Sequence, residues 1–350
     1  MTSAWIPLPL LCAPLLVPLP APGAGPRTPA RHEASRMSMG CAYAIVAYGE
    51  DERALPALVE AAFDEVDRID RLMSHYRPDS ALSRLNRRAA EGPAAVDPEL
   101  FDFIAEALRY SRESHGAFDV TVGPLMKAWG FFRSGGRIPG EDELAEARAR
   151  VGYRHVLLDP QRRTVRFRRP GVELDLGGIA KGYAVDRAVD VLRRAGVSAG
   201  LVSACGSTIY GLGAPPGREA WTVEVQDPID PERVASTVGL KDRALSVSGT
   251  AEKSFEKDGV RYSHVMDPRT GRPVQGVLSV AVLAPSGTAG DALDNAFFVQ
   301  GLERGRAAIE RLPGTDVLVF LPAGDSGWRL VRLHGPGPRS PHSLVRSRTP

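Results

Sequence analysis

Residues 173–186 read ELDLGGIAKGYAVD, and this stretch joins an expected strand to an expected helix. The apolar run at 172–176 predicts the strand, and the apolar spacing after Gly177 and Gly178 predicts a helix that ends near Arg194. Glycines let a backbone approach a phosphate closely, and a helix N-terminus offers free N–H groups to it. The segment matches neither the dinucleotide fingerprint nor the P-loop pattern, so a plain strand–turn–helix junction explains it equally well.

The elements expected on either side of this junction follow one another irregularly. Helical apolar spacing predicts helices over residues 50–72, 98–115, 291–300 and 302–311. Alternating apolar residues predict strands or hairpins over residues 41–48, 154–170, 199–203, 207–212, 220–226, 244–248, 262–266, 277–284 and 316–333. Because no regular βαβ order emerges, we expect an α+β fold in which mixed or antiparallel sheets pack against helices in one domain, residues 37–333.

Composition and charge are those of an ordinary globular chain. Of the 350 residues, 43% are hydrophobic and 25% are charged, and the formal net charge is +2. This balance gives no strong attraction toward nucleic acid, so no nucleic-acid partner is expected.

The two ends of the chain differ from its middle. Residues 1–25 contain an apolar, proline-rich run that predicts an export segment, although no Lys or Arg precedes the run. The prolines argue against a membrane-spanning helix. We therefore expect a periplasmic or extracytoplasmic protein, with a polar linker at residues 26–36 and a disordered tail at residues 334–350.

The chain has three cysteines, and one of them, Cys12, lies in the expected export segment. Cys41 and Cys205 could pair, but two cysteines do not make a disulfide framework. Two separate buried thiols are the simpler expectation.

One helical segment carries a possible cation site. Asp291, Asp294 and Asn295 fall on one face of the helix expected there. Two carboxylates and an amide oxygen suit a hard cation such as Mg²⁺. The alternative is that these acids lie at a helix N-terminus because the helix dipole favours them there.

Three further segments place polar groups beside apolar ones. His264, in YSHVMDPRTG at 262–271, is either part of a structural hairpin or a general base, because an ordinary histidine pKa lies near neutrality. Tyr76, in MSHYRPDSALSRLN at 73–86, and Phe118, in GAFDVTVGPL at 116–125, either stack on an aromatic ligand or belong to the core.

Taken together and in this order, the five segments resemble the ApbE family, the FAD:protein FMN transferases, over about Met37 to Leu333. The resemblance implies an α+β fold and an enzyme that uses FAD as substrate and Mg²⁺ as cofactor. Such an enzyme attaches FMN through a phosphoester bond to a Thr or Ser of a target protein and releases AMP. The implied partner is an extracytoplasmic electron-transfer subunit, which would place the enzyme near a membrane.

The resemblance also assigns roles to individual residues. It implies flavin or FAD contacts for Met39, Tyr76, Ala117, Phe118, Asp119, Asp175 and Lys181. It implies metal ligation by Gly178, through its backbone carbonyl, and by Asp291, Asp294 and Asn295. It implies that His264, or a nearby carboxylate, accepts the proton of the attacking hydroxyl.

Five positions depart from the family pattern. Cys41 and Asn295 each stand where the family commonly has Thr, and Ala251 stands where it has Tyr. The family's Asn-x-Gly-Gly appears here as Ser203-Ala-Cys205-Gly206. These changes keep two alternatives open, an FAD pyrophosphatase that yields FMN and AMP, and a flavin-binding protein with weakened catalysis. Because no acceptor-type Ser/Thr-Gly-Ala-Thr segment is found, self-modification is not expected.

Overall fold

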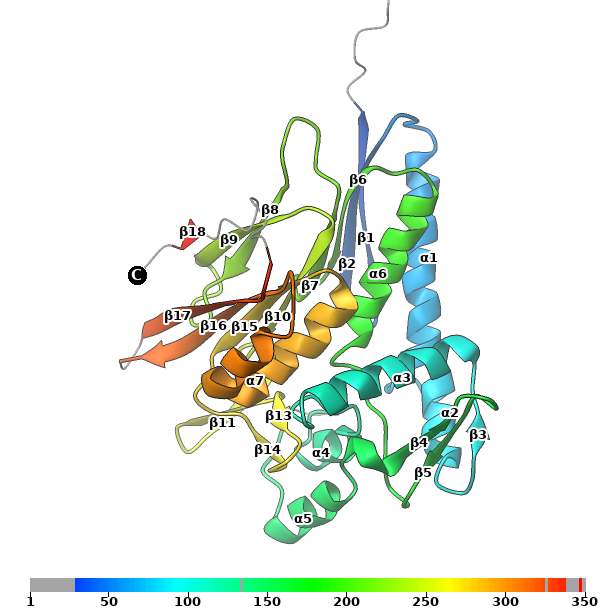
Figure 1. The fold of residues 1–350 in the computed structure, drawn as a ribbon, viewed down its shortest axis with the longest axis vertical. Helices are drawn as coiled ribbons and strands as arrows, with labels where there is room; N and C mark the ends of the chain where they lie inside the picture. The colour runs from blue at the N-terminus through cyan, green and yellow to red at the C-terminus, as the bar shows by residue number, and fades with distance from the viewer. Residues whose placement is uncertain (1–28, 133–134, 325–326, 338–345, 348–350) are drawn as a thin grey trace, which may run out of the picture.

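An eight-stranded antiparallel sheet forms the centre of the computed structural model, which describes residues 29–132, 135–324, 327–337 and 346–347. The strand order is β1-β2-β6-β7-β10-β15-β16-β17 (Figure 1). The strands are β1 (Ala30–Ser38), β2 (Cys41–Gly49), β6 (Ala199–Ala204), β7 (Thr208–Leu212), β10 (Arg243–Gly249), β15 (Ser279–Ala284), β16 (Asp316–Ala323) and β17 (Gly327–His334). The expected export segment lies outside the described residues.

Three long helices cover one face of this sheet, α1 (Leu55–Met73), α6 (Ala180–Arg194) and α7 (Gly287–Ile309). Figure 1 shows α1 and α6 side by side, with α7 on the strands that follow. A second sheet, in the order β18-β9-β8, packs on the opposite face; its strands are β8 (Trp221–Gln226), β9 (Val234–Leu240) and β18 (Arg346–Ser347).

Strand β15 has apolar side chains on both faces of the central sheet, so both faces must be packed against other elements. All its residues, SVAVLA, are buried. Val280 and Val282 pack with Phe297 of α7, whereas Leu283 packs with Trp221 of β8. A strand buried on both faces reads as a continuous apolar run, as this one does.

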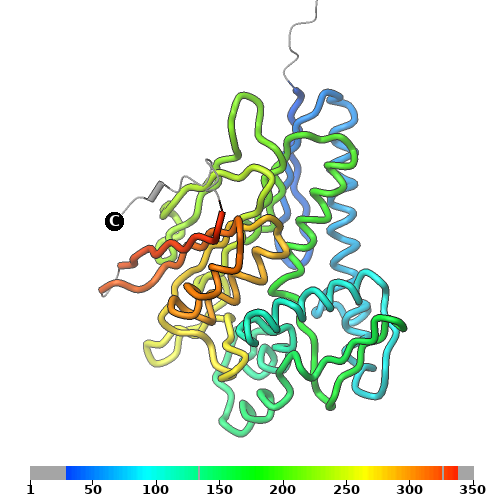
Figure 2. The backbone as a smooth tube through the Cα atoms, viewed as in Figure 1, coloured from blue at the N-terminus to red at the C-terminus, as the bar shows by residue number. Residues whose placement is uncertain are grey.

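The remaining elements lie at one end of the sheet layer, where the chain path in Figure 2 runs below α1 and α6. The helices are α2 (Ala81–Arg88), α3 (Pro98–Glu113), α4 (Gly123–Ala128), α5 (Glu141–Ala149) and the 3₁₀ turn η1 (Tyr153–His155). The short strands are β3 (Ala94–Ala95), β4 (Val156–Asp159), β5 (Thr164–Phe167), β11 (Ser254–Lys257), β12 (Val260–Ser263), β13 (Met266–Asp267) and β14 (Arg272–Pro273).

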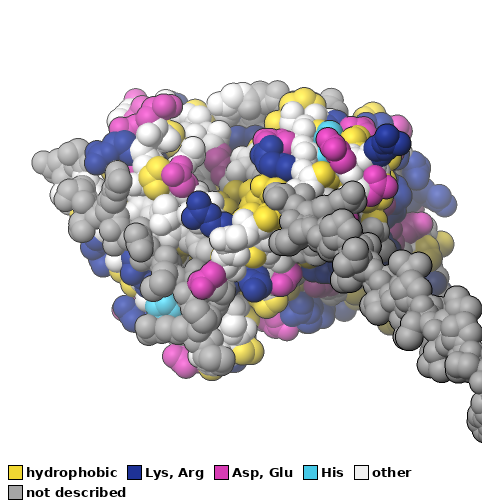
Figure 3. Space-filling view, turned by 90° about the horizontal axis from the view of Figure 1, so that it is seen from above, with side chains coloured by type: hydrophobic (Ala, Val, Ile, Leu, Met, Phe, Trp, Pro, Cys, Tyr) yellow, Lys and Arg dark blue, Asp and Glu magenta, His cyan; other side chains and the backbone are white. Residues whose placement is uncertain are grey.

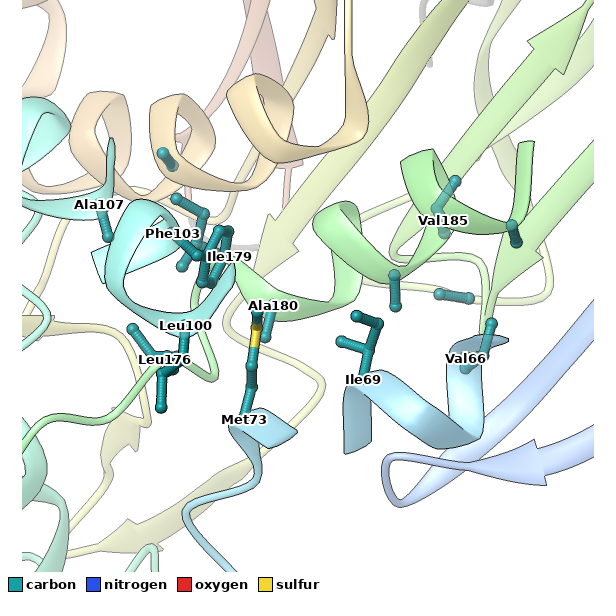
Figure 4. Close-up of a cluster of buried hydrophobic side chains, with 14 of the residues drawn as sticks. Val66, Ile69, Met73, Leu100, Phe103, Ala107, Leu176, Ile179, Ala180 and Val185 are labelled. Carbon is teal, nitrogen blue, oxygen red and sulfur yellow. The ribbon is translucent and has the colours of Figure 1, made fainter. Parts of the chain in front are cut away.

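A buried apolar cluster joins this end to the sheet layer. Figure 4 shows Ile69 and Met73 of α1 close to the start of α6, with Phe103 of α3 beside Ile179. Each of these side chains is almost fully buried. Burying a side chain of this size contributes roughly 2 kcal/mol. The cluster therefore holds the turn before α6 firmly against two helices.

The predicted α+β class is confirmed, but the expected linker at 26–36 is wrong where it is described, because residues 30–36 lie in β1. This strand is polar because it is a sheet edge with alternately half-buried and exposed residues. It joins β2 through the two residues Met39 and Gly40, whose φ angles are 49° and 76°. Two positive φ values are the signature of the type I′ hairpin turn.

The strand expected at 172–176 is also wrong. These residues form no strand, and their backbone is bonded to groups that are not in a neighbouring strand. Leu174 exchanges two hydrogen bonds of 2.9 Å with the Asn86 side chain, and the Asp175 N–H donates to the Val120 carbonyl at 2.7 Å. The following helix begins at Ala180 and reaches Arg194.

The two helices expected at 291–300 and 302–311 are the two parts of α7, and the first part begins earlier than expected, at Gly287. Ser286 caps it by accepting from the Ala289 N–H at 3.1 Å. Gly301, with φ 67° and ψ −172°, interrupts it near the expected boundary. Several elements lie outside the expected ranges, among them α2, α4, α5, β9 and β11.

At the C-terminus, Arg346 and Ser347 pair with Thr237 and Ser236 of β9, so this part of the expected disordered tail is a short strand. Residues 338–345 and 348–350 lie outside the described residues. Within the described ranges, no helix is both long and apolar enough to cross a membrane. On the face seen in Figure 3, basic and acidic side chains are interspersed.

Candidate active site

One cavity of about 640 Å³ collects every residue to which the sequence assigned a role. Its lining combines the β1–β2 turn, the loops that follow α1 and α3, the start of α6, the segment between β12 and β13, and α7. These residues are Met39, Tyr76, Ala117, Phe118, Asp119, Asp175, Gly178, Lys181, His264, Asp291, Asp294 and Asn295. The volume lies in the ordinary range for small-molecule and cofactor sites.

Helices α6 and α7 cross at two glycines and cap each other. A Cβ on Gly182 would lie 2.1 Å from the Gly287 carbonyl oxygen, so only hydrogens fit between the backbones. Asp291 of α7 accepts from the Gly182 N–H at 2.7 Å. Asp186 of α6 accepts from the Gly287 and Thr288 N–H groups at 2.7 and 2.8 Å. Each helix thus supplies a carboxylate to the first turn of the other.

Asp291 therefore does not act as an N-terminal acid of its own helix. It lies in the second turn of α7, and its carboxylate caps α6 and accepts from the Thr208 hydroxyl. Asp294 is buried beside it. Burial raises the pKa of both carboxyls, and the charge of Asp291 raises the pKa of Asp294 further. Two buried carboxylates that repel each other would be stabilised by a cation.

The Gly177–Gly178 turn meets this acidic face through Asn295. The Asn295 amide nitrogen donates to the Asp291 carbonyl and to the Asp294 carboxylate at 2.9 Å each, and it lies 3.4 Å from the Gly178 carbonyl oxygen. Asn295 meets these oxygens as a donor. For its amide oxygen to bind a cation, the amide would have to turn about its terminal torsion.

The described part of the chain contains no cluster of three or more His, Cys, Asp or Glu side chains that could hold a metal ion. Two carboxylates and a backbone carbonyl are nevertheless a suitable protein contribution to a Mg²⁺ site. Mg²⁺ in nucleotide enzymes is bound by one or two carboxylates and completes its shell with water and substrate phosphate.

The turn itself offers fewer N–H groups to a phosphate than the sequence suggested. The N–H groups of Gly177, Ala180 and Gly182 already donate to Asp175, Leu176 and Asp291. The positive charge at this point comes instead from Lys181, whose ammonium donates to the Ser207 hydroxyl at 2.6 Å. Burial works against that charge, but nearby acidic groups, Asp291 first among them, raise the pKa of Lys181.

His75 lies behind Asp175 and was not singled out from the sequence. Its Nδ1 is 3.2 Å from the Asp175 carboxylate and its Nε2 is 3.4 Å from that of Glu173. Lys127 pairs with Glu173 at 2.5 Å. Burial opposes charge on the imidazole, but the two carboxylates raise the pKa of His75 to about 9. In turn, burial would raise the pKa of Asp175, but His75 holds it below its usual value.

This network predicts how stability depends on pH. The folded-state pKa of His75, about 9, lies above the ordinary 6.5, so folding favours the imidazolium. Its contribution is present in full below pH 6.5 and is lost as pH rises through about 9. We expect His75→Gln to cost roughly 2 kcal/mol of unfolding free energy near neutral pH and little above pH 9. Urea unfolding of wild type and variant from pH 6 to pH 10 measures the difference in their free energies of unfolding. The same difference at every pH would contradict the proposed role of the His75 charge.

Tyr76 forms an aromatic wall of the cavity, and Phe132 stacks on it. Their rings stack with centroids 5.1 Å apart and planes 11° apart. The ring of His75 also lies close to Phe132, with centroids 4.7 Å apart. Tyr76 is 41% exposed, so this ring belongs to the wall of the cavity and not to the core. A flat, polarisable surface of this kind suits an aromatic ligand.

Asp119 holds part of the cavity wall in place through hydrogen bonds to neighbouring backbone and side-chain groups. Its carboxylate accepts from the Thr121 N–H and hydroxyl at 2.9 and 2.6 Å and from the Tyr153 N–H at 2.7 Å. These bonds tie the loop of Ala117 and Phe118 to the start of η1. Asp119 therefore fixes the position of the two residues before it.

His264 lines the cavity from the segment between β12 and β13. Its Nδ1 is 3.2 Å from the Lys253 carbonyl, which can only accept, so Nδ1 carries the proton and Nε2 keeps its lone pair. Burial lowers the pKa of His264 to about 4. The imidazole is therefore neutral at neutral pH and can accept a proton at Nε2.

The sequence analysis expected Cys41 and Cys205 to be buried, and this expectation is wrong. Cys41 is half-buried, Cys205 is exposed, both are free, and both line the cavity. The end of β6 lies beside the start of β2, which brings together two residues far apart in the chain. No sequence signal short of the strand pairing would have placed them together.

Comparison with known proteins gives the family. The ApbE family model matches residues 39–319. The FAD:protein FMN transferase of Treponema pallidum (strain Nichols) is 35% identical over 281 residues, 76% of this chain and 77% of the relative. That of Escherichia coli (strain K12) is 32% identical over 299 residues, 83% of this chain and 84% of the relative.

Solved structures of ApbE proteins also resemble this chain. The crystal structure of the ApbE protein from Thermotoga maritima superposes with a TM-score of 0.79 at 32% identity, covering 87% of this chain and 97% of that one. The flavin transferase ApbE from Vibrio cholerae gives a TM-score of 0.76 at 32% identity with the same coverage. From the match over residues 39–319, the shared fold and these relatives, we conclude that the chain belongs to the ApbE family.

Proposed function

We propose that this chain transfers FMN from FAD to a hydroxyl of a target protein and releases AMP. The observation that carries the proposal is the meeting of the Asp291/Asp294 pair with the Gly178 turn, in one cavity with an aromatic wall. The relatives named FAD:protein FMN transferase support it. The isoalloxazine ring would lie against the Tyr76 wall and the phosphates near Lys181.

The residues present fit Mg²⁺, which we include in the proposal. Asp291, Asp294 and the Gly178 carbonyl would hold the ion, with Asn295 joining after its amide turns. When bound, Mg²⁺ would neutralise charge on the pyrophosphate. Asp175, kept ionised by His75, and Lys181 would orient the ligand on either side of the acidic pair.

In the proposed reaction, the target Thr or Ser oxygen forms a bond to the FMN-side phosphorus, and the bond from that phosphorus to the AMP oxygen breaks. The hydroxyl proton passes to Nε2 of His264, which is free to accept it. Holding the hydroxyl in line with the leaving AMP supplies much of the rate. The aromatic wall and the Asp119-supported loop hold the flavin half in place.

The direct test is incubation with FAD, Mg²⁺ and a candidate acceptor domain, followed by measurement of AMP and of acceptor mass. Transfer is supported if AMP appears together with an acceptor heavier by one FMN. AMP with free FMN and an unchanged acceptor would support hydrolysis, and bound FAD with neither product would exclude both enzyme activities.

For His264→Gln we expect the transfer rate to fall about 100-fold while FAD affinity changes little. Glutamine keeps a donor for the Lys253 carbonyl but has no ring nitrogen to accept a proton. His32→Gln on the edge strand β1 is the matched control. Rates and FAD dissociation constants measured side by side check this; equal rates in both variants would remove His264 from the mechanism.

We also propose that the protein is exported and acts on an extracytoplasmic electron-transfer subunit near the membrane. The apolar run in residues 1–25 supports export. Cell fractionation, together with N-terminal mass analysis of the recovered protein, tests it.

A further inference from the structure

Two departures from the family pattern meet in the fold. Cys41 begins β2, and Cys205 follows the end of β6, the strand that pairs with β2. The Cys205 N–H donates to the Ala42 carbonyl at 2.8 Å, so the pairing continues to this point. In this register Cys205 lies opposite Ala42, so Cys41 and Cys205 are diagonal neighbours across the strand pair.

The two sulfurs interact directly. The Cys41 and Cys205 thiols lie close enough to influence each other, and the Cys205 sulfur also lies 3.8 Å from the Ser207 hydroxyl. The interaction with the Cys41 thiol, opposed by burial and aided by the charge of Lys181, lowers the pKa of Cys205 to about 6. The same interaction raises the pKa of Cys41. Cys205 is therefore the nucleophilic thiolate of the pair.

Both groups are reachable from solvent. Cys205 is exposed, Cys41 is half-buried, and both line the cavity. Cys205 has a φ of 43°, and Gly206 follows with φ 74°, so a tight turn holds the thiol at the strand end. A low-pKa, accessible cysteine beside a second, resolving cysteine is the arrangement of a reversible redox site.

We propose that Cys41 and Cys205 form a reversible disulfide in the wall of the cavity, made by exchange with a low-molecular-weight disulfide. The Cys205 thiolate attacks one sulfur of the external disulfide and releases one thiolate. Cys41 then loses its proton and attacks the Cys205 sulfur of the mixed disulfide, which releases the second thiolate. The pair is oxidised by two electrons, and the external disulfide is reduced to two thiols.

The bond would change the surroundings of Lys181. Ser207 accepts from Lys181 and lies next to the Cys205 sulfur, and oxidation draws that sulfur toward Cys41. The redox state of the pair is therefore coupled to the cationic side of the proposed FAD site. The disulfide also links two segments far apart in the chain, which restricts the unfolded state.

The test uses the full chain equilibrated with oxidised glutathione, then alkylated and digested with trypsin. We expect a cross-linked peptide that joins residues 37–53 to residues 195–218, lost on treatment with dithiothreitol. Cys12 falls in a separate peptide, residues 1–27, so Cys12→Ser is the matched control and should leave the cross-link unchanged. The oxidised protein should also unfold at a higher urea concentration than the reduced protein.

Cys205→Ser and Cys41→Ser should each abolish the cross-link and the redox dependence of unfolding. Because the family commonly has Thr at position 41, Cys41→Thr provides a second variant should Cys41→Ser fold poorly. Glutathione adducts without the cross-link, or a cross-link only in urea, would overturn the proposal. Peptide mass is read without FAD, so that result leaves the proposed transferase activity untouched.

Discussion

Asp291→Asn is expected to slow Mg²⁺-dependent AMP release and FMN transfer by about 1,000-fold, or about 4 kcal/mol in the activation barrier. Asp291 is the buried member of the acidic pair whose carboxylate accepts from the first turn of α6. Asparagine keeps the shape and an oxygen for the Gly182 N–H but removes the charge that would hold the cation. The fold should therefore survive while turnover does not.

The measurement is the rate of AMP release against Mg²⁺ concentration in wild type and variant. Glu303→Gln is the matched control, because Glu303 lies exposed on the same helix, away from the cavity. Its rate should match wild type. Unchanged turnover in Asp291→Asn, with Mg²⁺ still required, would mean that the cation lies elsewhere.

The second large effect concerns stability. Gly182→Ala should lower the free energy of unfolding by at least about 3 kcal/mol. Its Cβ would lie 2.1 Å from the Gly287 oxygen and 2.8 Å from the Thr288 nitrogen, and backbone atoms cannot move aside as a flexible side chain can. The helices would have to separate, which breaks both reciprocal caps.

Gly92→Ala is the control, because a Cβ there meets nothing within 4 Å and the backbone is not in the left-handed region. Chemical unfolding of the three proteins separates loss of packing from the general effect of replacing glycine. Equal unfolding midpoints for Gly182→Ala and Gly92→Ala would show that α6 and α7 do not cross as closely as described.

The sequence predicted the structure correctly where the residues of a single segment are enough to determine it. The apolar run of β15, the helix ended near Arg194 and the 291–295 face are all local features, and all were found. The resemblance to the family assigned roles to residues that are far apart in the sequence, and the fold brings these residues to one cavity. Their individual roles remain predictions, since the geometry places these residues without showing a ligand.

The sequence failed where a partner far along the chain decides the structure. Leu174 bonds to the side chain of Asn86 and not to a neighbouring strand, and nothing near residue 174 reveals this. His75 is charged because Glu173 and Asp175 face it. Asp291 looked like an N-terminal acid because its real partner, the Gly182 N–H, belongs to another helix.

The edge strand β1 has a consequence for how the molecule behaves in crowded solution. Its polar residues, which read as a spacer, occupy the hydrogen-bonding side of β2, whose sequence CAYAIVAYG is almost wholly apolar. Without β1, that strand would present a row of unpaired backbone groups to any other copy. The polar hairpin arm thus terminates the sheet and protects the enzyme from strand-to-strand polymerisation.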